Sequence, residues 1–343
     1  MRKYHQQRDE ARGLTVELCL LLAIAAVGTI LVSTIAMAGL ATFGAYGYVA
    51  NTTTIKMPDG YWQGIFYHLL VQCGVFTVVA VVGTTVYQTW QLTEGGGRHV
   101  ARLLGGTRII APCDDTNCAT LLNIVEELAI ATGIKAPAVY ILARDGGINA
   151  FAAGLDTKDA VIGVTRGAID RLKRNQLQGV IAHEFSHIIN GDMRLNIQIL
   201  GVLTGVQAIT LAARFLLRIG TPNGDTGKHP LGMILALVFG AALWPIGQIG
   251  SLFAMLIHFA VNRQREFLAD ASAVQYTRDP IGLYEALTIL LEDELGSRIS
   301  GPSARLASHL FFASDGSAWS RLFESHPPLA ERIRRLDPMA AKN

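Results

Sequence analysis

Four long apolar runs without a charged residue dominate the pattern of hydrophobic and polar positions. They cover Leu18–Ile55, Gly60–Thr93, Leu195–Ala213 and His229–Asn262. A helix needs ~20 residues to cross the hydrocarbon core of a bilayer, and each run is of that length or longer. The third run is the shortest and could be a buried helix of a soluble domain, but Arg214 at its end can extend to a membrane interface. The pattern therefore predicts four transmembrane helices.

The segments between these runs have the patterns of folded structure. Thr120–Gly133 places its Leu and Val residues on one side and its glutamates on the other, which predicts a helix. Ala138–Ala143, Asn149–Ala153 and Ala160–Val164 read as short strands separated by turns that contain Gly and Asp. A second helix is predicted over Gln176–Ile189, where an Asn-Gly pair follows. We expect an α+β membrane protein with a small β-sheet.

The first apolar run could also belong to a cleaved signal peptide. Basic residues precede it, and Ala36-Met37-Ala38 resembles a cleavage site. The run is much longer than the roughly 7–15 apolar residues of a signal peptide. We therefore expect an uncleaved membrane anchor.

Five consecutive segments follow from this pattern. We expect a cytoplasmic N-terminus over residues 1–13, and two transmembrane helices with a short outer loop over 14–93. The first part of a folded domain then covers 94–194, two more transmembrane helices cover 195–262, and the second part of the domain covers 263–343. Four spans place the N-terminus and both parts of this domain on one side of the membrane.

The distribution of basic residues predicts which side that is. Of the 29 Lys and Arg residues, only Lys56, Arg214, Arg218 and Lys228 fall on the opposite side. Cytoplasmic segments carry an excess of Lys and Arg, although the outer loops here are short. We expect the folded domain to face the cytoplasm, as in a multi-pass protein of a bacterial inner membrane.

Composition agrees with a membrane protein. Half of the residues are hydrophobic and only 16% are charged, whereas a soluble domain has about 25% charged residues. The formal net charge is +2 and the basic residues form no long run. A nucleic-acid partner is therefore not expected.

The sequence His183-Glu184-Phe185-Ser186-His187 indicates a metal site within the predicted helix Gln176–Ile189. Residues four apart lie on one face of a helix, so both imidazoles can reach one ion. Glu184 then lies beside that ion without being a ligand, as in zinc peptidases. The alternative is a helix with two ordinary histidines, but its apolar neighbours indicate a half-buried helix in which these polar groups need partners.

A third ligand is expected because catalytic zinc has three protein ligands and one open position. Glu266 follows the fourth apolar run, as the third run follows the helix with the two histidines. Both segments therefore leave the membrane at the same face. Asp270 is one turn further on and can accept the outer N–H of a ligand histidine. The alternative is that Glu266 and Asp270 belong to a solvated face beside Arg263 and Arg265.

These roles predict peptide hydrolysis with one zinc ion per chain. Zinc activates a water and polarises the scissile carbonyl. Glu184 is expected to take the proton of the water and to pass it to the leaving amine. His326 could stabilise the developing oxyanion, and Arg332, nearby on the following helix, is a candidate for substrate binding. His326 could equally be a surface residue that caps the next helix.

The segment Asn149-Ala150-Phe151-Ala152 is a candidate for substrate binding. A strand at a sheet edge can pair with an extended polypeptide through backbone hydrogen bonds, which tolerates many sequences. The segment could equally be an ordinary core strand.

Together these residues resemble the HtpX-type heat-shock membrane zinc metalloproteases, which are gluzincins related to the CAAX prenyl proteases. The resemblance extends over Gly105–Asn196 and Val261–Leu336. Its specific elements are Leu122–Glu127, Asn149–Gly154, Val164–Gly167, His183–His187, Asn190–Asp192, Arg263–Asp270 and Ser325–Leu329.

The resemblance implies a zincin-like protease domain with zinc held by His183, His187 and Glu266. It also implies that Glu184 is catalytic, that Asp270 supports a ligand, and that the protein degrades misfolded or membrane proteins at the cytoplasmic face. Two other functions compete with this one: processing of lipid-modified peptides, and a catalytically inactive membrane scaffold. The first is disfavoured because such enzymes have more spans, and the second because every ligand is present.

Overall fold

The computed structural model describes residues 2–54, 56–113, 115–221, 230–292 and 327–337. The chain divides into two compact units, each formed by segments that are distant in the sequence. The mixed α/β unit contains Met1–Leu18, Thr93–Ile197 and Phe259–Asn343. The helical unit contains Cys19–Leu92 and Gln198–His258.

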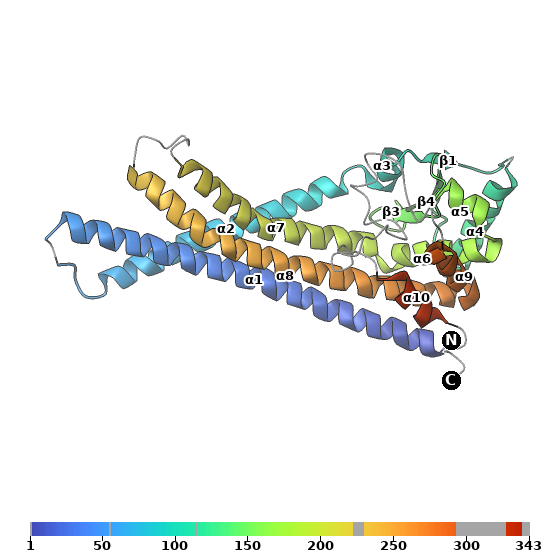
Figure 1. The fold of residues 1–343 in the computed structure, drawn as a ribbon, viewed down its shortest axis with the longest axis horizontal. Coiled ribbons are helices and arrows are strands. Elements are labelled where there is room, and N and C mark those ends of the chain that lie inside the picture. The colour runs from blue at the N-terminus through green and yellow to red at the C-terminus, as the bar shows by residue number, and fades with distance from the viewer. Residues whose placement is uncertain (1, 55, 114, 222–229, 293–326, 338–343) are drawn as a thin grey trace. The chain divides into compact units, whose positions relative to one another are not determined.

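Each of the four predicted spans is a helix, labelled α1, α2, α7 and α8 in Figure 1. Their bounds are Arg2–Thr52, Tyr61–Thr93, Asp192–Ile219 and Pro230–Thr277. All four are long and apolar enough to cross a membrane, which confirms the prediction. Three of them extend well beyond the apolar runs, and α8 continues for 15 residues after Asn262.

The helical unit has an apolar surface, as expected for helices that contact lipid. Large apolar side chains such as Ile24, Val71 and Phe76 are more than 60% exposed, which a soluble protein avoids over large areas. Inside the unit, α2 and α7 approach closely. A Cβ atom on Gly201 would lie 2.2 Å from Thr89 Oγ1, and one on Gly205 would lie 2.1 Å from Thr85 Oγ1. Small residues allow such close packing of helices in membranes.

The mixed α/β unit contains one four-stranded sheet with the order β1-β2-β4-β3. The strands are Thr107–Ile109, Ala138–Leu142, Ala150–Ala153 and Val161–Thr165, for β1 to β4. β2 and β4 are parallel, whereas β1 and β3 pair antiparallel at the two edges. The three predicted strands are confirmed within one residue at each end. β1 was not predicted because three residues are too few to show an alternating pattern.

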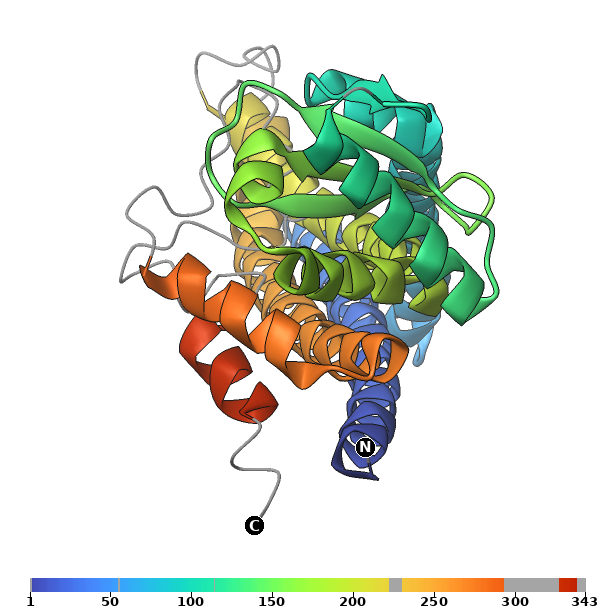
Figure 2. The ribbon, with the colours of Figure 1, turned by 90° about the vertical axis from the view of Figure 1, so that its right-hand side faces the viewer.

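Shorter helices surround the sheet in this unit. They are α3 (Gly96–Leu103), α4 (Thr116–Thr132), α5 (Arg166–Arg171), α6 (Arg174–Asn190), α9 (Pro280–Glu292) and α10 (Leu329–Leu336). One face of the sheet packs in a single apolar core with α4, α6 and α9. The other face packs with α3 in a smaller core around Tyr140 and Phe151. Figure 2 shows α6, α9 and α10 in succession beneath the strands, coloured from yellow-green to red.

Helix α6 contains the predicted segment Gln176–Ile189 and ends where the sequence indicated. Gly191 adopts a left-handed conformation (φ 68°) and its N–H donates to His187 and Ile188 carbonyls. Only a residue without a Cβ adopts this conformation at little cost, so an Asn-Gly pair is a strong stop signal. The stop separates α6 from α7, which begins at Asp192.

Candidate metal centre

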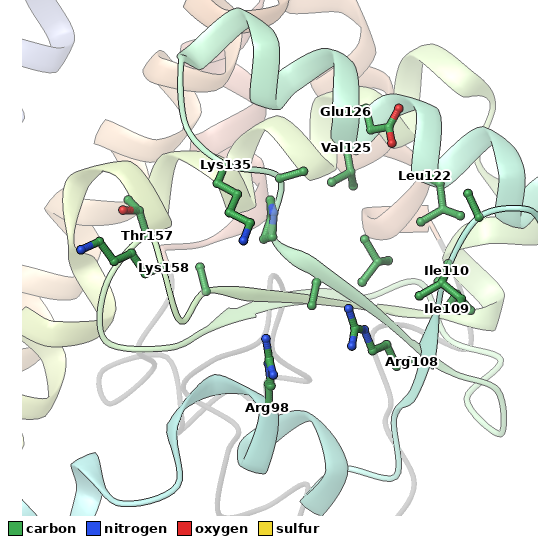
Figure 3. A pocket seen from close by; sticks show the side chains of 16 residues that line it. Arg98, Arg108, Ile109, Ile110, Leu122, Val125, Glu126, Lys135, Thr157 and Lys158 are labelled. Carbon is green, nitrogen blue, oxygen red and sulfur yellow. The ribbon is translucent and has the colours of Figure 1, made fainter.

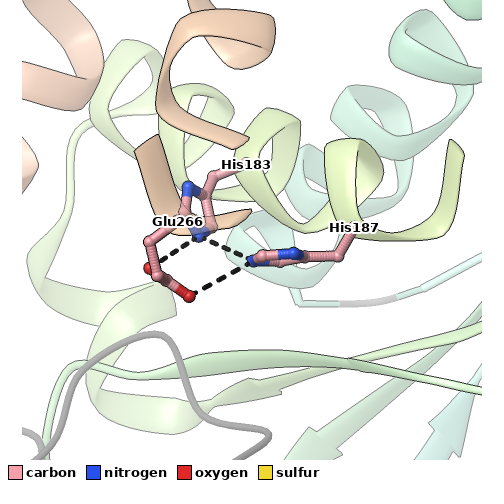
Figure 4. Close-up of side chains that lie close together, drawn as sticks. All are labelled: His183, His187 and Glu266. Carbon is pink, nitrogen blue, oxygen red and sulfur yellow. Dashed lines mark hydrogen bonds and ion pairs between the residues drawn. The ribbon is translucent and has the colours of Figure 1, made fainter. Parts of the chain in front are cut away.

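Three polar side chains on two helices converge at one point of the mixed α/β unit. His183 and His187 come from α6 and Glu266 from α8 (Figure 4). The Nε2 atoms of the two histidines are 3.0 Å apart, and each lies 3.6 Å from one carboxylate oxygen of Glu266. One ligand atom from each residue lies within 4.8 Å of the other two. Two imidazoles and a carboxylate in this arrangement can bind one ion.

The outer nitrogen of each histidine contacts an aspartate, which orients the ring. His183 Nδ1 is 2.9 Å from Asp270 Oδ1, and His187 Nδ1 is 2.6 Å from Asp192 Oδ2. When Nδ1 donates its proton to a carboxylate, the lone pair of Nε2 is free for a metal ion. Both Nε2 atoms therefore face the same point as donors, and this donor set of two N and one O fits zinc.

Each aspartate contacts an arginine in turn. Arg332, from α10, donates to both oxygens of Asp270 at 2.7 and 2.9 Å, and its Nη1 is 3.2 Å from Glu266 Oε2. Arg265 pairs with Asp192 and donates to the Asn190 carbonyl at 2.9 Å. The site thus contains two His–Asp–Arg chains, one behind each of the two candidate histidine ligands.

Burial and charge set the protonation of the candidate site. His183 is fully buried, and burial together with the nearby Arg332 lowers its pKa to about 4. The imidazole is then neutral at physiological pH, which is the form that binds a metal ion. Burial and the negative charge of Glu266 raise the pKa of Glu184 well above its usual range. A cation at the site would reverse part of that shift.

Glu184 lies between the candidate metal site and the sheet. Its carboxylate accepts a hydrogen bond from the Ala152 backbone N–H of β3. Its other oxygen, Oε1, is buried and has no hydrogen-bond partner among the described residues. A buried carboxylate oxygen with no partner is costly in a folded protein, so this atom is available to a water or a substrate.

The strand beside Glu184 presents only its backbone. The side chains of Asn149, Ala150 and Phe151 are each 1% exposed. Ala150 packs in the core under α6, and Phe151 packs in the core on the other face of the sheet. Among the described residues, however, β3 is an edge strand, and its backbone groups that point away from β4 pair with no other strand there.

The remaining sequence candidates occupy different places. Arg332 was expected near the substrate, and the structure places its guanidinium, 0% exposed, against Asp270 and Glu266. His326 lies outside the described residues.

Sequence reasoning did not identify Asp192 and Arg265 as site residues. Asp192 is five residues after His187 and on the far side of the helix stop at Gly191, so no helical spacing relates the two. Arg265 reaches Asp192 only because α8 packs beside the end of α6. The available signal was the position of a carboxylate directly after a glycine stop, where the chain can turn back to the last helical turn.

Comparison with known proteins agrees with this geometry. The model of peptidase family M48 matches residues 116–340. A protease HtpX homolog from Thermoanaerobacter pseudethanolicus is 34% identical over 296 residues, which cover 85% of this chain and 93% of the relative. One from Dictyoglomus turgidum is 40% identical over 226 residues, covering 65% and 70% of the two chains.

Among solved structures, the chain is similar to the crystal structure of S. mikatae Ste24p. The TM-score is 0.45 at 18% identity, covering 96% of this chain and 66% of that chain. The family match and the HtpX relatives, together with four apolar helices and a His–His–Glu group, lead to one assignment. The chain belongs to peptidase family M48 and is a membrane metalloprotease of the HtpX type.

Proposed function

We propose that the protein is a zinc-dependent endopeptidase that cleaves misfolded or membrane proteins at the cytoplasmic face of the membrane. The observation that supports it most is the convergence of His183, His187 and Glu266, with Glu184 adjacent. In this proposal the three convergent residues hold one zinc ion. The zinc would polarise the scissile carbonyl and activate a water for attack.

Glu184 is proposed as the general base and then the general acid. Its burial and its proximity to Glu266 favour the protonated carboxyl, and a positive charge at the site favours the carboxylate. When these two effects oppose each other, the pKa of the carboxyl allows it to take a proton from water and to return it to the leaving amine. Because its free oxygen is buried, the proton is not lost to bulk solvent between the two steps.

The substrate is proposed to pair with the outer edge of β3. Thr165 N–H donates to the Asn149 carbonyl, so the backbone of residue 149 points toward β4. Backbone direction alternates along a strand, and the groups of Ala150 and Ala152 therefore point outward. The N–H of Ala152 contacts Glu184, so a peptide added along this edge would lie beside the proposed base. Recognition through the backbone allows many substrate sequences.

Membrane or misfolded substrates are proposed because the candidate ligands lie close to apolar helices in the sequence. Glu266 is four residues after the uncharged run of α8, which is about 6 Å along a helix. We further propose that His326 donates a hydrogen bond to the oxyanion, because the segment Ser325–Leu329 resembles the corresponding segment of HtpX proteases. Arg332 is proposed to act on the substrate only through Glu266 and Asp270, which it contacts.

Replacement of Glu184 tests the proposed function. Glu184→Gln should lower the cleavage rate of an unfolded membrane substrate by about 10²–10⁴-fold and should retain one zinc per chain, measured by mass spectrometry. Glu127→Gln on α4, an exposed partner of Arg174, is the matched control and should cleave at the wild-type rate. Equal rates for Glu184→Gln and wild type would contradict the role of Glu184. Preference for a prenylated peptide over unfolded chains would contradict the substrate class.

A further inference from the structure

The mixed α/β unit contains a hollow beside β1 and the start of β2, and none of the three candidate metal ligands lines it. Its volume is about 250 Å³, and it is lined by α3, β1, α4 and the turns before β2 and β4 (Figure 3). Leu122 and Val125 of α4 supply apolar contacts. The volume is smaller than the ~300–1,000 Å³ of most drug-sized ligand sites, so it suits a single small group.

The charged residues around the hollow are almost all basic. Arg98, Arg108, Lys135 and Lys158 line it, with Glu126 as the one acidic residue. Among the described residues, these four cations form no ion pair and no side-chain hydrogen bond. By contrast, other basic residues of the unit, such as Arg166 and Arg174, are paired with carboxylates.

Three of the cations point toward the same space. Figure 3 shows Arg98, Arg108 and Lys135 extending into the hollow from three different directions, whereas Lys158 and Glu126 turn away from it. Like charges that converge without a counter-ion repel one another, and an anion between them removes this repulsion. Two guanidinium groups and an ammonium group are well suited to the oxygens of a phosphate group.

The position of α3 in the sequence indicates where such a phosphate comes from. The last turns of α2 carry Tyr87 and Trp90, which are 58% and 57% exposed. Exposed Tyr and Trp at the end of a span mark the membrane–water interface. Arg98 follows Trp90 by only eight residues, within the short helix α3. The head groups of the bilayer are therefore within reach of this segment.

From these observations we infer that the hollow lined by Arg98, Arg108 and Lys135 binds the phosphate of an anionic phospholipid head group. Exposed basic residues near a membrane surface attract anionic lipids, and the converging side chains add a defined position for the phosphate. Lipid binding at this hollow does not depend on the metal site or on proteolysis.

The test uses the full-length protein in a neutral detergent. Short-chain phosphatidylglycerol is titrated and its dissociation constant is measured by thermophoresis. Arg108→Gln/Lys135→Gln should weaken binding by about tenfold or more, since each basic residue contributes roughly fivefold. The matched control, Arg102→Gln/Arg144→Gln, removes the same charge from two exposed residues that do not line the hollow. It should bind within twofold of wild type, and both variants should retain wild-type proteolysis.

Three outcomes would overturn the inference. Equal loss of affinity in both double variants would mean diffuse surface charge. Equal affinity for phosphatidylcholine would mean that the negative charge is not recognised. Displacement of the lipid by inorganic phosphate at similar concentration, or by an acidic soluble peptide at lower concentration, would assign the hollow to a free anion or to a protein.

Discussion

His183 and His187 are the same residue type on one face of one helix, yet their surroundings differ. The His183 side chain is 0% exposed and that of His187 is 16% exposed. Asp270 and Arg332 stand behind the first, and Asp192 and Arg265 behind the second. The two His–Asp–Arg chains fix both imidazoles, because a carboxylate that accepts the Nδ1 proton sets the orientation of the ring. For the less buried His187, the carboxylate that accepts at Nδ1 comes from Asp192, 2.6 Å away.

Replacement of Asp192 tests whether this contact orients His187. Asp192→Asn retains the shape of the side chain but removes the charge that polarises His187 and balances Arg265. We expect zinc affinity to fall by about 10–100-fold, measured by competition with a chromogenic chelator. Asp170→Asn, which alters an exposed pair with Arg166, should leave zinc affinity unchanged. Wild-type affinity in Asp192→Asn would show that His187 is positioned by other contacts.

At the scale of elements, the position of α6 depends on its close contact with α9. A Cβ atom on Gly179 of α6 would lie 2.6 Å from the backbone N of Leu283 in α9. One on Gly282 of α9 would lie 2.3 Å from the Asn175 carbonyl of α6. The two helices thus meet backbone to backbone, and neither can shift without moving the candidate ligands that α6 carries.

A methyl group at this contact is expected to destabilise the protein. Gly179→Ala gains about 1 kcal/mol of helix propensity, but the added Cβ meets backbone, which cannot rotate away. We expect a net loss of about 1–3 kcal/mol, measured as a melting temperature lower by several degrees. Gly146→Ala, where a Cβ would have no neighbour within 4 Å, should change the melting temperature little. An unchanged melting temperature in Gly179→Ala would mean that α6 and α9 separate at low cost.

At the scale of the whole molecule, four apolar helices long enough to cross a membrane alternate with the segments that form the mixed α/β unit. We expect four spans to leave residues 1–13, 94–194 and 263–343 on one side of the membrane. Segments of the mixed α/β unit come from all three of these ranges. An even number of spans is therefore necessary for this unit to assemble from the two parts of the chain that carry the candidate ligands.

The proposed orientation is tested with topology reporters in a bacterial host. Because basic residues concentrate on the side of the mixed α/β unit, we expect green fluorescent protein fused after Asn343 to fluoresce, which requires the cytoplasm. Alkaline phosphatase inserted at Asp59, between α1 and α2, should be active, which requires the opposite side. A non-fluorescent C-terminal fusion together with inactive phosphatase at Asp59 would contradict the proposed orientation and indicate the reverse one.

Much of this protein was determined by its sequence alone, because the relevant signals are local. An uncharged run of about 20 residues has few alternatives to a membrane helix. A spacing of four places His183 and His187 on one helical face wherever that helix lies. The strands β2 to β4 and the stop at Gly191 were also predicted from short patterns.

Only the tertiary structure decided which distant groups meet. The sequence nominated Glu266 and Asp270, but their distances to the histidines depend on how α8 packs beside α6. Asp192 and Arg265, and the convergence of Arg98, Arg108 and Lys135, were not visible in the sequence. The physical reason is the distance along the chain over which each kind of interaction acts. Local propensities act over a few residues, whereas burial of apolar faces determines which distant elements pack, and polar side chains at these faces take whatever partners the packing provides.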